Sequence, residues 1–177
     1  MIRPAIICVD DQSEVLESVL RDIEEFEKHF DIQDCDSPAD ARSVLNDFEQ
    51  ESKPVALIIS DHMMPGETGV DFLASVHQDQ RFPHVRKLLL TGLATHEDTI
   101  RAINEAKLDS YIAKPWKAEK MKNTVKVLLT LAVFDMGLDL GDYSESLDAD
   151  TIKKCKEGSE DTHKTVLSNL LQGDQGY

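Results

Sequence analysis

The sequence predicts an α/β fold in which helices cover both faces of a five-stranded parallel sheet. Short apolar runs alternate with amphipathic segments in five successive units along the first 132 residues. The apolar runs are too brief for helices and are rich in β-branched residues, which is typical of buried strands. Alternation of strand and helix favours a parallel sheet, because each strand must be followed by a crossover.

Each of the five units carries its own local signals. The strands are expected at residues 5–9, 32–35, 55–60, 87–90 and 110–113. Ser13 is placed to cap the first helix, whose apolar residues recur at helical spacing. Ser37-Pro38 predicts the start of the second helix, since serine caps and a proline at the first helical position are both common there. The remaining helices are expected from about residue 68, over residues 97–106 and over residues 121–132.

Composition narrows the classes of function. A length of 177 residues suits one domain with some chain to spare, and the net charge of −15 disfavours direct binding of nucleic acid or anionic membranes. The sequence has no apolar run of 18 residues and no apparent signal peptide, so membrane insertion is not expected. Three widely spaced cysteines form neither a disulfide framework nor a zinc pattern, which favours a cytoplasmic location.

Charged and polar residues follow four of the predicted strands. Asp10-Asp11 follows the first strand, Asp61 the third, Thr91 the fourth and Lys114 the fifth. Because the carboxyl ends of parallel strands open onto one crevice, these side chains are expected to converge. Clustered carboxylates repel one another without a cation, and their oxygens suit Mg²⁺. The sequence therefore predicts a site for phosphoryl chemistry with Mg²⁺ as its cofactor.

This arrangement resembles the receiver domain of bacterial response regulators, the chemotaxis-type receivers of two-component signalling systems. The resemblance covers residues 4–132, and it includes Met64-Pro65 after the third strand and Tyr111 within the fifth. It implies a doubly wound (βα)5 flavodoxin-like receiver fold, with a short C-terminal extension that is helical or partly disordered.

The resemblance implies a role for each site residue. Asp61 would be the phosphoacceptor, and Lys114 would place a positive charge against the transferring phosphoryl group. Asp10, Asp11, Asp61 and the backbone carbonyl of Met63 would be the magnesium ligands.

The resemblance also implies a two-state switch. Thr91 would hydrogen-bond a phosphoryl oxygen, and Tyr111 would then turn into the vacated space. The Lys114-Pro115 bond is expected to be cis. Gly92 lacks a side chain, so we expect the phosphoryl group to be open to water and the phosphorylated state to be short-lived.

We expect a phosphorylation-dependent regulator that receives its phosphoryl group from a sensor histidine kinase or a histidine phosphotransfer protein. Self-catalysed phosphoryl transfer and autodephosphorylation would be its only chemistry, so it is not expected to be a turnover enzyme. Alternatively, the chain is the receiver of a longer protein whose effector is a cyclic-nucleotide cyclase or phosphodiesterase. A haloacid dehalogenase-type phosphatase needs a second acid two residues after the nucleophile, where Met63 stands here.

Residues 133–177 form an acidic C-terminal extension, expected to be a poorly packed interaction or linker segment with two short helices. The helices are predicted at residues 148–156 and 161–171. Before this extension, residues 128–134 are apolar nearly all round the helix, which is more than one buried face needs. This run predicts a contact with another surface, either in a homodimer or with a downstream partner protein or fused effector.

Overall fold

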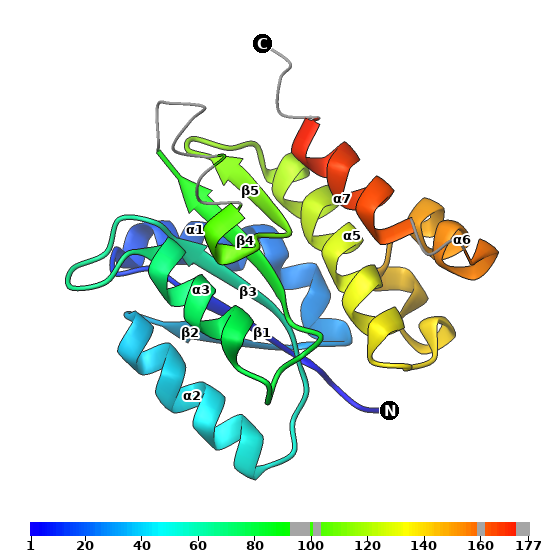
Figure 1. Ribbon diagram of the computed structural model, residues 1–177, viewed down its shortest axis with the longest axis horizontal. Helices are drawn as coiled ribbons and strands as arrows, with labels where there is room; N and C mark the ends of the chain where they lie inside the picture. The colour runs from blue at the N-terminus through cyan, green and yellow to red at the C-terminus, as the bar shows by residue number, and fades with distance from the viewer. Residues whose placement is uncertain (93–99, 101–103, 159–161, 173–177) are drawn as a thin grey trace.

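The computed structural model describes residues 1–92, 100, 104–158 and 162–172 (Figure 1). Its centre is one sheet of five parallel strands in the order β2-β1-β3-β4-β5. The strands are β1 (Ala5–Val9), β2 (Asp31–Cys35), β3 (Val55–Asp61), β4 (Arg86–Thr91) and β5 (Ser110–Ala113). The predicted fold class is confirmed. The strand order reverses between β1 and β3, so a crevice opens at the carboxyl ends of these two strands.

Helices cover both faces of the sheet (Figure 1). They are α1 (Ser13–Ile23), α2 (Pro38–Gln50), α3 (Gly69–Gln78), α5 (Ala118–Asp135), α6 (Ala149–Glu157) and α7 (Thr162–Gln172), with short 3-10 helices η1 (Glu24–Lys28) and η2 (Leu140–Ser146). One face packs against α1 and α5, and the other packs against α2 and α3. The helix expected over residues 97–106 lies largely outside the described residues, although residues 104–106 are helical.

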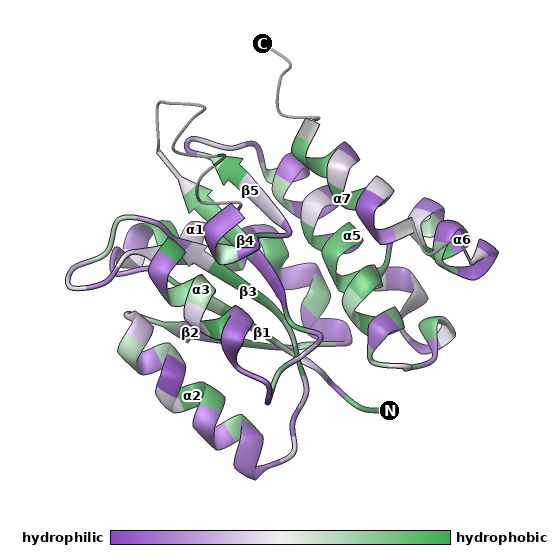
Figure 2. Ribbon diagram, viewed as in Figure 1, coloured by the Kyte–Doolittle hydropathy of each residue, from purple (hydrophilic) through white to green (hydrophobic). Residues whose placement is uncertain are grey.

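The central strands are buried on both sides, which explains their continuous apolar sequence. In β1, Ile6 faces the cluster under α1 and α5, whereas Ile7 faces the cluster under α2 and α3. Ile59 and Ile58 divide between the same two clusters in β3. Figure 2 shows these strands as apolar ribbons between helices whose outer faces are polar.

Of the two expected N-caps, Ser37 is present and Ser13 is not, while Thr68 caps the helix expected from about residue 68. Ser37 accepts a hydrogen bond at the start of α2, and Thr68 does so at the start of α3. The expectation that Ser13 caps α1 is wrong, because the N-cap is Gln12 and no side chain caps this end. The Gln12 N–H instead donates to the Asp10 carboxylate, at 2.9 Å. The turn after β1 is thus organised by a candidate site residue.

The C-terminal extension is packed, so the expectation of a poorly packed appendage is wrong. Tyr143 is 1% exposed, and its hydroxyl donates to the backbone carbonyl of Ile2. The ring of Tyr143 lies 5.6 Å from that of Phe30, measured between centroids. Leu140 and Leu147 join the same core cluster as α1 and α5. Acids and glycines make up about a third of this segment, and a few apolar side chains anchor it.

The two predicted short helices are present as α6 and α7, and Asp148 caps α6. On the outer side of α5, Leu131 packs against Cys155 of α6 and Val166 of α7. Residues 128–133 of the apolar run are therefore covered within the chain, and only Phe134 of the run is exposed, at 40%. The expected homodimer thus loses most of the observation on which it rested. The division at residue 132 stays a prediction. Among the described helices, none has the length and apolar composition needed to cross a bilayer.

Candidate functional site

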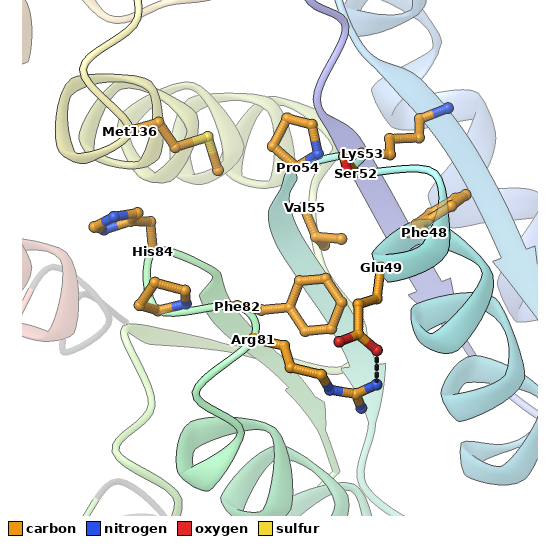
Figure 3. A pocket seen from close by; sticks show the side chains of 11 residues that line it. Phe48, Glu49, Ser52, Lys53, Pro54, Val55, Arg81, Phe82, His84 and Met136 are labelled. Atoms are coloured by element: carbon orange, nitrogen blue, oxygen red, sulfur yellow. Dashed lines mark hydrogen bonds and ion pairs between the residues drawn. The ribbon is translucent and has the colours of Figure 1, made fainter.

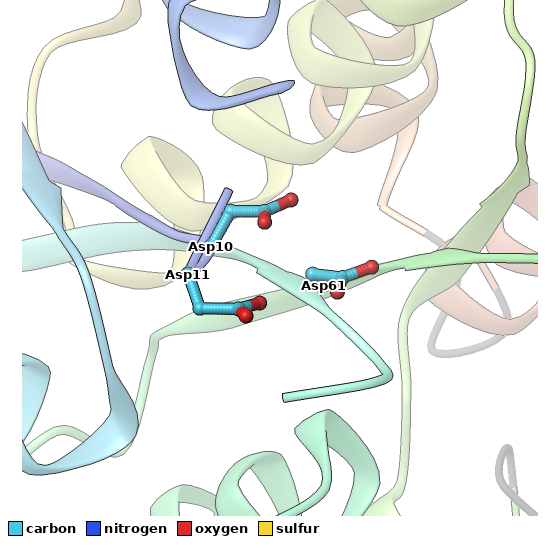
Figure 4. A group of neighbouring side chains, drawn as sticks. All are labelled: Asp10, Asp11 and Asp61. Carbon is cyan, nitrogen blue, oxygen red and sulfur yellow. The ribbon is translucent and has the colours of Figure 1, made fainter. Parts of the chain in front are cut away.

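Three carboxylates converge at the carboxyl ends of β1 and β3, and we call them the acid cluster (Figure 4). Asp10 and Asp11 follow β1 directly, and Asp61 is the last residue of β3. Pairing of Val9 with Ser60 brings the two strand ends level. One oxygen from each of the three carboxylates lies within 4.8 Å of the others. The predicted convergence is therefore present in the structure.

The acid cluster is mostly removed from water. Asp10 is 2% exposed and Asp61 is 4% exposed, whereas Asp11 is exposed to solvent. Burial raises the pKa of the Asp10 carboxyl above its usual range, and the charges of Asp61 and Asp11 raise this pKa further. The Gln12 N–H and the Lys114 ammonium act in the opposite direction without cancelling this increase.

Lys114 supplies positive charge to the acid cluster from the end of β5. Its Nζ lies 2.6 Å from Asp61 Oδ1 and 3.6 Å from Asp10 Oδ2. The Lys114 N–H donates to the Thr91 carbonyl at 2.8 Å, which ties the ends of β4 and β5 together. The Lys114-Pro115 bond is cis, as expected. One ammonium faces three carboxylates, so the cluster keeps an excess of negative charge.

The donor set fits a hard divalent cation. Asp10 Oδ2 is buried and has no hydrogen-bond partner among the described residues. A buried carboxylate oxygen without a partner is costly, and coordination of a cation would remove that cost. Carboxylate oxygens are the ligands that Mg²⁺ takes in proteins. The Met63 side chain is 68% exposed, and the role of its backbone carbonyl stays a prediction.

The two candidate switch residues lie on β4 and β5. Thr91 ends β4, is 2% exposed and pairs with Ala113 of β5. Tyr111 lies within β5, is partly buried and packs against the cluster under α2 and α3. Thr91 therefore stands at the same edge of the sheet as the acid cluster. The switching role of both residues stays a prediction.

Gly69 is a site residue that sequence reasoning missed. The loop after Asp61 returns to β3, where the Gly69 N–H donates to the His62 carbonyl at 2.8 Å. A Cβ atom on Gly69 would lie only 1.9 Å from the Asp61 carbonyl oxygen. Glycine is thus required for the loop to close against the acceptor strand. The available signal was a second glycine three residues after Gly66.

A separate cavity of about 250 Å³ lies at the opposite end of the sheet (Figure 3). Phe48, Phe82 and Met136 contribute apolar walls, and an ion pair of 2.7 Å joins Arg81 to Glu49 at its side. This cavity adjoins the start of β3, whereas Asp61 ends that strand. It is therefore not part of the acid cluster.

A five-stranded parallel sheet with acids at the ends of its first and third strands defines the receiver class of α/β domains. The chain matches the response regulator receiver domain family over residues 6–126, and it belongs to that family.

Similar proteins include regulators and chemotaxis proteins. The chain is 32% identical over 121 residues to the hydrogenase transcriptional regulatory protein HoxA of Cupriavidus necator, covering 68% of this chain and 23% of that protein. It is 30% identical over 122 residues to the chemotaxis protein CheY-3 of Vibrio cholerae, covering 66% of this chain and 85% of CheY-3. The match thus spans about a quarter of HoxA but most of CheY-3.

Solved structures show the same fold. The signal receiver domain of an HD domain-containing protein from Pseudomonas fluorescens Pf-5 superposes with a TM-score of 0.66 and 25% identity, covering 77% of this chain and 94% of that one. A structure described as an adenylate cyclase from Rhodopirellula baltica gives a TM-score of 0.64 at 21% identity, with the same coverage of 77% and 94%. About a quarter of this chain lies outside each superposition.

Proposed function

We propose that this chain is a phosphorylation-dependent response regulator whose phosphoacceptor is Asp61. The observation that carries the proposal is the acid cluster, with Lys114 Nζ held 2.6 Å from the Asp61 carboxylate. The phosphoryl donor is a phosphohistidine on a sensor histidine kinase or a histidine phosphotransfer protein. In the transfer, an Asp61 oxygen attacks phosphorus, an acyl phosphate forms and the bond from phosphorus to the histidine nitrogen breaks.

The acid cluster holds Mg²⁺ in this proposal through Asp10, Asp11 and Asp61. When bound there, Mg²⁺ supplies positive charge that offsets the phosphoryl oxygens. Lys114 faces Asp61 from the end of β5, and its ammonium passes from the carboxylate to a phosphoryl oxygen as transfer proceeds. The burial of Asp61 leaves its attacking oxygen largely desolvated before transfer.

The switch proceeds through the ends of β4 and β5. The Thr91 hydroxyl donates to a phosphoryl oxygen, which draws the end of β4 toward Asp61. The Lys114 N–H already donates to the Thr91 carbonyl, so this movement is passed directly to β5. Tyr111 lies on β5 and follows the movement of that strand. The phosphoryl group thereby changes the surface that the protein offers to its partners.

The chain acts as a signalling switch rather than a turnover enzyme. Its only chemistry is its own phosphorylation and the later hydrolysis of the acyl phosphate. A dehalogenase-type phosphatase would need an acid two residues after Asp61, but Met63 occupies that position. The output passes through protein contacts, either with a separate downstream protein or with an effector joined to the same chain.

Acetyl phosphate with Mg²⁺ tests this proposal. Intact mass spectrometry should find one added phosphoryl group on the wild type and none on Asp61→Asn. Asp47→Asn is the matched control, because Asp47 is an exposed acid on α2, and this variant should be modified like the wild type. Removal of Mg²⁺ with a chelator should abolish the modification. Phosphorylation of Asp61→Asn, or full modification under chelation, would contradict the proposal.

A further inference from the structure

The C-terminal extension has a firmly anchored part. In η2, Tyr143 is almost fully buried, and the Ser146 hydroxyl lies 2.7 Å from the His29 ring nitrogen Nδ1. In α6, Thr151 is 2% exposed and donates both its N–H and its hydroxyl to Asp148. These segments share the core of the domain and cannot leave without exposing it.

The last helix, α7, is held much less firmly. Of its residues whose burial is described, Val166 is buried, whereas Leu167, Leu170 and Leu171 are only partly buried. An open cavity of about 220 Å³ remains between α5, α6 and α7, with Val127 in its lining. Side chains that line an unfilled cavity make fewer dispersion contacts than side chains in a close-packed interface. Leu167 and Leu170 pack against the rim of the main core cluster, but no described α7 side chain is a buried member of it, whereas Tyr143 of η2 is. Lifting α7 should therefore cost less than removing η2.

The polar contact at the start of α7 does not prevent its release. His163 Nε2 lies 3.4 Å from Asp135 Oδ1, and its ring meets the edge of Phe134. Asp135 also pairs with Arg86, so the Asp135 carboxylate keeps a cationic partner when His163 leaves. Release of α7 thus strands no unpaired charge at this point.

The surface beneath α7 is a stripe on α5 beside the edge strand of the sheet. Val127 and Leu131 of α5 pack with Val166 and Leu167 of α7, and Cys155 of α6 lies in the same cluster. α7 also contacts β5, which is an outer strand of the sheet (Figure 1). Uncovered apolar side chains next to a sheet edge form a surface that favours association.

We propose that α7 is a displaceable cover over this α5 stripe, and that an amphipathic helix of a partner protein takes its place. α7 itself indicates the chemistry of the partner, because its apolar residues Val166, Leu167 and Leu170 recur at intervals of one and three. A partner helix with this pattern would bury the stripe left bare. Coupling of release to Asp61 rests on the proposed function, since β5, which α7 contacts, carries Tyr111 and leads to Lys114.

The native cysteines provide the first test in the full chain. Cys155 lies under α7, whereas Cys8 and Cys35 lie in the sheet core, and all three thiols are free and buried. Val166→Asp should raise the rate of Cys155 alkylation by at least tenfold and leave Cys8 and Cys35 protected. The matched control is Thr165→Asp, which adds the same charge at an exposed neighbouring position and should label like the wild type.

The labelling pattern distinguishes release of α7 from unfolding of the whole domain. Protection of Cys8 and Cys35 in Val166→Asp shows that the core remains folded. Unchanged Cys155 labelling in that folded variant would overturn the proposal, because α7 would then not be what shields the thiol. This arm involves no phosphoryl group, so its result is independent of the proposed role of Asp61.

A fluorescent peptide with the sequence of residues 162–172 tests whether the uncovered α5 stripe binds a helix. The peptide should bind full-length Val166→Asp at least tenfold more tightly than the wild type, whose tethered α7 competes at high effective concentration. Equal binding to both would overturn the proposal that the stripe accepts a helix. Beryllofluoride with Mg²⁺ should speed Cys155 labelling in the wild type but not in Asp61→Asn, and equal rates would overturn the coupling alone.

Discussion

The two ends of β4 lie near two charged clusters that differ in their balance of charge. At the carboxyl end, three carboxylates face one ammonium, that of Lys114. At the amino end, Arg86 and Lys87 face Asp109 and Asp135, and we call this group the amino-end network. Arg86 Nη1 lies 3.0 Å from Asp109 Oδ1, and Lys87 Nζ lies 3.5 Å from Asp109 Oδ2.

The difference shows how a binding site can be told from a structural brace. Both clusters contain buried charge, so burial alone does not distinguish them. In the amino-end network two cations match two carboxylates, although Arg86 Nε is buried without a hydrogen-bond partner among the described residues. In the acid cluster three carboxylates face one ammonium, and Asp10 Oδ2, 3.6 Å from Lys114 Nζ, has no hydrogen-bond partner among the described residues. A bound cation would balance this charge. Imbalance of charge is therefore the feature that indicates function.

Breaking the amino-end network should give the largest effect on stability. Arg86→Met leaves Asp109 and Asp135 without their guanidinium partner, and it should lower the free energy of unfolding by about 3–5 kcal/mol. Urea denaturation followed by circular dichroism measures this loss. Lys122→Met is the control, because the Lys122–Glu25 pair is exposed, and this variant should lose less than about 1 kcal/mol. Equal losses would show that the network is not a brace.

A side chain at position 69 should disturb the acid cluster at the carboxyl end of β3. Gly69→Ala places a Cβ against the Asp61 carbonyl, and the resulting overpacking should cost about 1–3 kcal/mol of unfolding free energy. Phosphorylation by acetyl phosphate should also slow, since the acceptor strand must shift. Gly92→Ala should keep wild-type stability, because a Cβ there meets nothing within 4 Å. Wild-type stability and rate in Gly69→Ala would contradict the close approach.

Magnesium should stabilise the protein through the acid cluster and leave the amino-end network unaffected. A cation at ten times its dissociation constant should raise the free energy of unfolding by about 1.4 kcal/mol. Asp10→Asn should lose this response and should be more stable than the wild type without metal, because a buried like charge is removed. Thermal unfolding with and without chelator measures both effects. An undiminished magnesium response in Asp10→Asn would place the cation elsewhere.

Because the pKa of Asp10 is raised in the folded state, the contribution of Asp10 to the stability of the metal-free protein should fall as pH rises. The folded state holds the Asp10 proton more tightly than the unfolded chain, whose carboxyl has its ordinary pKa of 3.8. As pH rises above 3.8, the wild type should therefore lose stability relative to Asp10→Asn until the folded pKa is passed. Urea titrations in chelator across this range measure the difference. A difference that shrinks with rising pH would contradict the assignment.

The smallest effect concerns the lifetime of the phosphorylated state. Gly92 follows Thr91 without a side chain, so water reaches the acyl phosphate, and Gly92→Ala should lengthen its half-life several-fold. Loss of the phosphoryl group over time, followed by intact mass, measures this rate. A half-life of many hours in the wild type would contradict the role given to Gly92.

Much of the fold and the acid cluster could be predicted because their signals are local. Each strand is a short apolar run, and each candidate residue stands where such a run ends. Parallel pairing then brings Asp10, Asp61 and Lys114 to one edge without any further information. The Ser13 cap failed because the helix begins one residue earlier than expected: Ser13 is already helical, and the Val15 and Leu16 N–H groups donate to the Gln12 carbonyl.

The features that were missed depend on contacts between distant segments. The apolar run of α5 correctly indicated that another surface packs against it. Because the extension is acidic, a second molecule was expected there, but the extension itself provides this surface. The extension packs through a few residues, of which Tyr143 contacts Phe30 and Ile2 at the far end of the chain. Gly69 fell within the helix expected from about residue 68 and was given no role, because its approach to the Asp61 carbonyl appears only when the loop closes.

Trp116 is an intrinsic fluorescence probe close to the acid cluster. It is the sole tryptophan of the chain, it lies two residues after Lys114, and its indole N–H donates to Asp22 of α1 at 2.8 Å. A ligand that draws the Lys114 ammonium away from Asp61 pulls on the short segment that positions this indole. The emission of unlabelled protein should therefore follow titrations with magnesium and with phosphoryl analogues, free of background from any second indole.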